Sequence, residues 1–187
     1  MNLKDLLSEK KSAIVKRWFE IILESYPTDS SNFFKKQKNR FANPVGYALS
    51  QGVEGIFDDL LQEVEPEEVT PLLDSIIRIK AVQDFSPSQA ISFIFLLKMV
   101  IREELGNKIS TDRMYEELLA FESKIDDLAL LAFDIYMKCR EKIYEFKSNE
   151  VRNMTFTLLK RANLICEIQD REQDSGPETV LTKNIKG

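Results

Sequence analysis

The chain has 187 residues, of which 43% are hydrophobic, and a formal net charge of −5, values that fit one domain large enough to bury a hydrophobic core. It contains no histidine, which excludes histidine-based acid–base catalysis, histidine-containing triads and histidine-ligated zinc or haem. The negative charge argues against nucleic acid as a partner, and because the sequence holds no glycine-rich phosphate loop or nucleophile motif we expect no enzyme activity, no metal and no cofactor.

The first apolar stripe predicts a helix that ends at Tyr26 and is broken near Ser8. Its apolar residues recur every four positions, which is a helical period: Ile14, Trp18, Ile22 and Tyr26. Pro27 ends this helix because proline cannot donate a backbone hydrogen bond. A basic helix or turn is expected next, over 32–41.

The middle of the chain predicts three further helices. The first starts with Asn43 as N-cap and Pro44 in the first turn, runs to about residue 64, and contains Gly52 and Gly55, which we expect to allow close approach of another helix. The second starts at Thr70-Pro71. The third follows the capping box Ser86-Pro87-Ser88-Gln89 and ends near residue 105. Because it is apolar on nearly all sides, it is either central or partly covered by a second subunit.

No glycine or proline lies between Gly106 and Gly176, so one long helix is expected. A first apolar stripe ends at Phe146, and the five-residue step to Val151 interrupts the heptad repeat. The second stripe has the spacing of a two-helix seam. We therefore expect a homodimer whose seam includes Ile125, Leu128, Ile135, Val151, Met154, Leu158 and Ile165.

These elements predict an all-α helical bundle over 1–150, a coiled-coil-like extension over 151–169 and a disordered polar tail over 170–187. The apolar run 90–101 is too short to span a bilayer. Cys139 and Cys166 lie too far apart on a straight helix to pair, and the N-terminus does not look like a signal peptide. We expect a cytoplasmic protein without membrane contact.

Three sequence blocks together resemble a known family. They are RFANPVG at 40–46, FSPSQA at 85–90 with Leu97-Lys98, and the block 126–142. They resemble the N-terminal domain of the RsbT co-antagonist protein RsbRD, and the likeness covers 3–152. The resemblance implies a cytoplasmic helical input domain of stress signalling, related in role to the dimeric, non-haem, globin-like sensors of the stressosome.

In that family a helix leaves the input domain and leads to a STAS output domain. Only a short polar tail follows Asp170 here. The chain is therefore either a free-standing version, which would pass its signal to a separate protein partner, or the input part of a longer protein.

One candidate binding site lies at the start of the helix that Pro44 opens. Arg40 precedes the expected helix start, and helix N-termini attract anions. With Asn43 and Tyr47 it can form a pocket for a small anion or carboxylate. The structural alternative is that Arg40 pairs with a carboxylate of another helix.

A second candidate is a polar cluster inside the apolar block of the long helix. Asp134 and Lys138 have the favourable spacing for a helical ion pair, and Tyr136 and Arg140 lie beside them. Such a cluster can be a salt-bridge network, a device that sets dimer register, or part of a ligand pocket.

Two main functions follow from these patterns. The first is a dimeric, non-enzymatic input domain that relays a signal to a protein partner by shifting helix packing or register. The alternative is a ligand-binding sensor or carrier with a pocket near Arg40 for an apolar or carboxylate ligand, since the 12 phenylalanines leave room for an apolar cavity. A purely structural adaptor is a third possibility.

Overall fold

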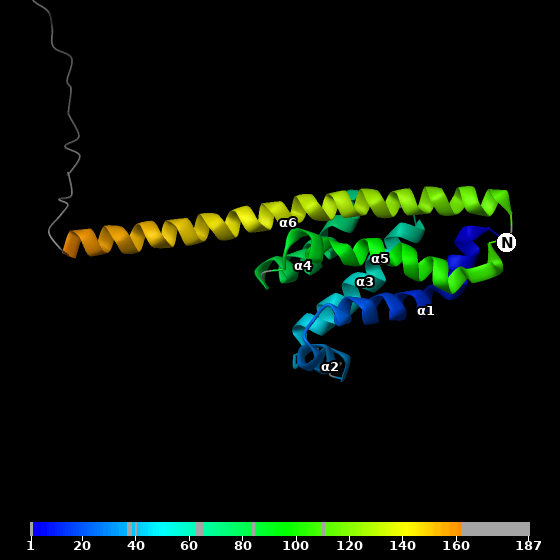
Figure 1. Cartoon of the computed structure of the whole chain (residues 1–187), viewed down its shortest axis with the longest axis horizontal. Helices are drawn as coiled ribbons and strands as arrows, with labels where there is room; N and C mark the ends of the chain where they lie inside the picture. The colour runs from blue at the N-terminus through cyan, green and yellow to red at the C-terminus, as the bar shows by residue number, and fades with distance from the viewer. Residues whose placement is uncertain are drawn as a thin grey trace, which may run out of the picture. The chain divides into compact units, whose positions relative to one another are not determined.

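The computed structural model describes residues 2–36, 39, 41–62, 66–83, 85–109 and 111–161. Over these residues the fold is an all-α helical bundle with a long C-terminal helix, as predicted (Figure 1). The helices are α1 (Leu3–Glu24), α2 (Thr28–Lys36), α3 (Pro44–Gln62), α4 (Pro66–Val82), α5 (Pro87–Leu105), the short 3-10 helix η1 (Gly106–Lys108) and α6 (Asp112–Arg161).

The chain divides into two compact units, Met1–Phe146 and Lys147–Gly187. The first unit contains the five helices α1 to α5, η1 and the first part of α6. The second contains the end of α6. The predicted disordered tail over 170–187 lies outside the described residues.

Helix α1 begins with a capping box and continues without interruption to Glu24. The Asn2 side chain accepts a hydrogen bond from the N–H of Asp5 at 2.8 Å, and the Asp5 carboxylate accepts one from the N–H of Asn2 at 3.2 Å. The predicted break near Ser8 is wrong, because an unbroken helix places apolar residues from both sides of Ser8 in the core: Leu3, Leu6, Leu7, Ile14 and Trp18. Helix α2 starts at Thr28, earlier than predicted.

Helix α3 is capped and closely packed where the sequence predicted it. The N–H of Gly46 donates to Oδ1 of Asn43 at 2.8 Å, which satisfies an N–H of the first turn. A Cβ atom at Gly52 would lie 2.8 Å from Cδ1 of Ile76, and one at Gly55 would lie 2.5 Å from Cδ1 of Leu72. These distances confirm that the two glycines allow α4 to approach α3.

Helix α4 starts at Pro66 and contains Pro71, so the predicted start at Thr70-Pro71 is wrong. Proline is well suited to the first position of a helix, where its missing N–H costs nothing. Pro71 lies in the second turn and removes one backbone hydrogen bond there. Its ring is on the exposed side of α4, and the helix continues through it to Val82.

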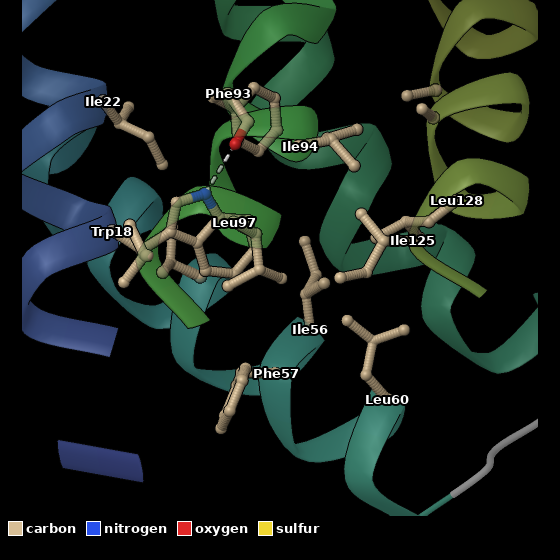
Figure 2. Packing of buried hydrophobic residues seen from close by; sticks show 14 of the residues in the cluster. Trp18, Ile22, Ile56, Phe57, Leu60, Phe93, Ile94, Leu97, Ile125 and Leu128 are labelled. Carbon is tan, nitrogen blue, oxygen red and sulfur yellow. Dashed lines mark hydrogen bonds between the residues drawn. The ribbon is translucent and has the colours of Figure 1, made fainter. Parts of the chain in front are cut away.

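Helix α5 carries the predicted capping box and lies between α1 and α6. The N–H of Ser86 donates to Gln89 Oε1 at 3.0 Å, and the N–H of Gln89 donates to Ser86 Oγ at 3.4 Å. Figure 2 shows the Trp18 indole N–H of α1 donating to the Phe93 carbonyl of α5, at 2.7 Å. Eight of the 19 residues of α5 are buried, and two of its large apolar side chains are exposed, Phe95 at 49% and Met99 at 41%.

The first part of α6 packs in the core of the same chain. Figure 2 shows Ile125 and Leu128 beside residues of α3 and α5, and Ile135 is also buried. Arg102 of α5 forms two hydrogen bonds of 2.6 Å with Glu122, and Lys98 pairs with Asp126 at 2.6 Å. Ile125, Leu128 and Ile135 are therefore buried against their own chain, and their part in a seam between two copies stays a prediction.

Candidate functional site

The first predicted site, around Arg40, is only partly within the described residues. Arg40 itself lies outside them. Asn43 is 1% exposed, and its side chain also donates to the Phe34 carbonyl at 3.2 Å, so this amide caps α3 and joins it to α2. Tyr47 is partly exposed on α3. A pocket formed by Arg40, Asn43 and Tyr47 stays a prediction.

In the second predicted site, two of the residues meet at the connection between α4 and α5. The Tyr136 hydroxyl donates to the Phe85 carbonyl, and the Arg140 guanidinium donates to the Ala81 carbonyl at 3.1 Å. Arg140 also donates to the Tyr144 hydroxyl at 3.0 Å and lies over its ring. Helix α6 therefore holds the 81–85 segment at both of its ends.

Asp134 does not belong to this cluster. It is exposed, and two residues along a helix turn the side-chain direction by roughly 200° from that of Tyr136. Among the ion pairs of the described residues there is none between Asp134 and Lys138. The structure thus brings Tyr136 and Arg140 together and leaves Asp134 apart from them.

The structure adds Lys80, which sequence reasoning missed. This residue lies near the end of α4 and is 0% exposed. Its ammonium nitrogen faces three aromatic rings, at 4.5 Å from the centroid of Phe85, 5.1 Å from that of Tyr26 and 5.6 Å from that of Phe93. We call Lys80 and these three rings the lysine box.

The sequence did hold a signal for Lys80. Leu73, Ile76 and Ile77 form the buried stripe of α4, and Lys80 follows at the next helical step of three or four residues. A charged residue at a core position of an amphipathic helix is an exception to the usual pattern and marks a candidate site.

The charge of Lys80 is compensated by aromatic rings and one long hydrogen bond. Nζ donates to Ser25 Oγ at 3.5 Å, and no carboxylate of the described residues pairs with it. Each cation–π contact is worth about 0.5–2 kcal/mol. Desolvation lowers the pKa of Lys80 to about 8, because burial disfavours the charged form.

Tyr26 adds a second incompletely satisfied group to the lysine box. Its hydroxyl is buried and has no hydrogen-bond partner, and burial raises the pKa of Tyr26 to about 12. Its ring is fixed by edge contacts to Phe34 and Phe85, with centroids 5.3 Å away in each case. The lysine box therefore contains two buried donors with few acceptors.

The lysine box is connected directly to α6. The ring of Phe85 lies under the Lys80 ammonium, while the carbonyl of the same residue accepts the hydrogen bond of Tyr136. Ala81, the residue after Lys80, accepts the hydrogen bond of Arg140. A movement of the lysine box would thus change the contacts that α6 makes.

The described part of the chain offers neither a metal site nor a membrane-spanning helix. No group of three or more cysteine, aspartate and glutamate side chains is placed there to hold a metal ion. None of the described helices is long and apolar enough to cross a membrane.

These features define an all-α domain with a long C-terminal helix and a buried lysine site beside it. The chain belongs to the family described as the RsbT co-antagonist protein rsbRD N-terminal domain, which matches residues 12–151. Family membership confirms the resemblance seen in the sequence and makes the chain a regulatory domain of the stressosome type.

A relative supports the extent of this domain. The chain is similar to an uncharacterized protein of Archaeoglobus fulgidus, with 29% identity over 143 residues that cover 75% of this chain and 83% of the relative. No solved structure matches the chain, so the likeness to globins stays a prediction.

Proposed function

We propose that the chain is a dimeric, non-enzymatic input domain of cytoplasmic stress signalling, which relays a signal through α6 to a protein partner. Family membership supports the regulatory role. The observation that carries dimerisation and relay is a row of exposed apolar residues along α6, the helix whose first part also holds the 81–85 segment.

The exposed apolar residues of α6 follow a heptad repeat. Five apolar residues at intervals of seven are all exposed: Leu130, Met137, Tyr144, Val151 and Leu158. Seven residues is the repeat of a two-helix coiled coil. An exposed apolar row of this length is unusual for a monomer and typical of an interaction surface.

This row also explains the phase break expected between Phe146 and Val151. Phe146 is 75% exposed, and the last buried residue of the core stripe is Cys139. The step in spacing therefore lies between two different stripes of α6. One stripe packs in the core and ends at Cys139, and the other, which contains Val151, is exposed. The exposed row itself keeps its interval of seven, so it supports one continuous seam.

We propose that the two helices pair in parallel, because each residue of the row then faces its own copy. Val151 and Leu158 of the original prediction belong to this row, and Met154 is exposed beside it. Ile165 lies outside the described residues.

A double variant tests the seam. Changing Val151 and Leu158 to glutamate places like charges in the apolar row, and we expect sedimentation velocity to show a folded monomer where the wild type is a dimer. The matched control is Phe156→Glu, because Phe156 is 48% exposed on α6 but lies off the row. A double variant that sediments as the wild type does would contradict the proposal.

A further inference from the structure

We propose that Lys80 and Tyr26 form a buried binding site for a small, singly charged anion of the carboxylate class. The binding itself does not depend on the dimer or the relay proposed above. It uses other residues than the pocket predicted around Arg40, since Lys80 lies on α4 and Tyr26 follows the end of α1.

The first argument is the charge of the lysine box. Lys80 is fully buried, yet its ammonium group has three aromatic rings and one serine hydroxyl as partners and no carboxylate of the described residues. Aromatic faces attract a cation but carry no net charge. An anion would supply the missing negative charge.

The second argument is the hydroxyl of Tyr26, which is independent of the first. It is buried without a hydrogen-bond partner, although a phenolic hydroxyl is both a donor and an acceptor. Contacts with Phe34 and Phe85 fix the ring, so the hydroxyl cannot simply turn to solvent. A carboxylate has two acceptor oxygens and can accept from both Lys80 and Tyr26.

The surroundings select the charge of the ligand. The guanidinium of Arg140, on α6, donates to the carbonyl of Ala81 next to Lys80, which adds a second positive charge on that side. The rings of Tyr26 and Phe93 are buried, so a small, singly charged carboxylate such as formate or acetate costs less to desolvate in these apolar surroundings than a multiply charged phosphate.

The protein contains its own reporter for this site. Trp18 is the only tryptophan of the chain, and it is fully buried. Its ring stacks on Phe93, one wall of the lysine box, with centroids 6.0 Å apart, and its indole N–H donates to the Phe93 carbonyl. A ligand that moves Phe93 should therefore change the tryptophan fluorescence.

The test is a titration of the full chain with sodium formate or acetate at constant ionic strength, with sulfate, a doubly charged anion, as the balancing anion. We expect a saturable change in Trp18 fluorescence in the wild type. Lys80→Met should abolish it, and Tyr26→Phe should weaken the affinity by about tenfold, the effect of one lost hydrogen bond. The control Lys98→Met removes a lysine that pairs with Asp126 at the α5–α6 contact and should bind as the wild type does.

Two results would overturn the site. One is a wild type that shows no saturable response to either anion, which would mean that Tyr26 is satisfied by water alone. The other is a response that persists in Lys80→Met. The wild-type titration decides the first point even if a variant fails to fold, and sedimentation of the same samples reports separately on the dimer.

Discussion

Replacing Lys80 by methionine keeps the length of the side chain and removes its charge. Burial lowers the pKa of Lys80 from 10.5 to about 8 in the folded protein, so between these values the unfolded chain binds more protons than the folded one. Stability therefore rises with pH through this window, and below pH 8 the folded protein carries the full cost of the buried charge. At about 1.4 kcal/mol for each pH unit, that cost is about 3 kcal/mol.

Lys80→Met should consequently be more stable than the wild type at pH 7, and its advantage should shrink by about 2–3 kcal/mol when the pH is raised to 10. Urea unfolding of both proteins at pH 7, 8, 9 and 10 measures the difference between their free energies of unfolding. All other titrating groups are the same in the two proteins, so their contributions cancel in this difference. A difference that stays constant over the range would show that Lys80 is solvated or paired in the folded protein, and would refute the reasoning.

Three further variants test individual contacts. Tyr136→Phe removes the hydrogen bond to the Phe85 carbonyl and should cost about 1 kcal/mol of stability, whereas Tyr115→Phe, at an exposed tyrosine of the same helix, should cost nothing measurable by urea unfolding. Gly52→Ala places a Cβ atom 2.8 Å from Ile76 Cδ1 and 2.9 Å from Ile76 Cγ1 and should cost about 1–2 kcal/mol, even after the gain of about 1 kcal/mol in helix propensity. Its control is Gln51→Ala on the exposed side of α3, and equal melting temperatures would contradict the close packing of α3 and α4. Asn43→Ala removes the side-chain cap of α3 and should lower the free energy of unfolding by about 1 kcal/mol. Asn43→Ser keeps a capping oxygen and should restore most of this stability. An unchanged melting temperature in Asn43→Ala would count against the cap.

Helix starts with a complete local signal could be predicted from the sequence. Asn43-Pro44 and Ser86-Pro87-Ser88-Gln89 each place a capping side chain directly before a proline, and both helices begin there. A single proline was a less reliable signal of where a helix begins or ends. Pro71 lies within α4, because the core contacts of the following residues outweigh the one hydrogen bond that proline removes.

The spacing of apolar residues predicted which positions of α6 form apolar contacts. It did not predict whether those contacts lie within the chain or are left exposed. Leu128 and Ile135 are seven residues apart, as are Val151 and Leu158, yet the first pair is buried in its own chain and the second pair is exposed. The difference depends on α3 and α5, which lie beside the first part of α6 (Figure 2), and no local pattern in α6 contains that information.

The candidate site could be predicted only in part, because it is assembled from distant segments. Tyr136 and Arg140 stood out as polar residues in an apolar block, and both contact the segment between α4 and α5. Asp134 shared that block but points elsewhere. Lys80 was missed because a lysine is normally solvated, and the three rings that cover it come from separate segments of the chain.

A disulfide between two copies tests the α6 seam most directly. In a Cys166→Ser background, Leu158→Cys places a thiol in the heptad row, and in a parallel pair the two copies of this residue face each other. Mild oxidation should convert the protein to a covalent dimer on a non-reducing gel, while Phe156→Cys, off the row, should remain largely uncrosslinked. Equal crosslinking at both positions, or none at position 158, would contradict a parallel seam along α6.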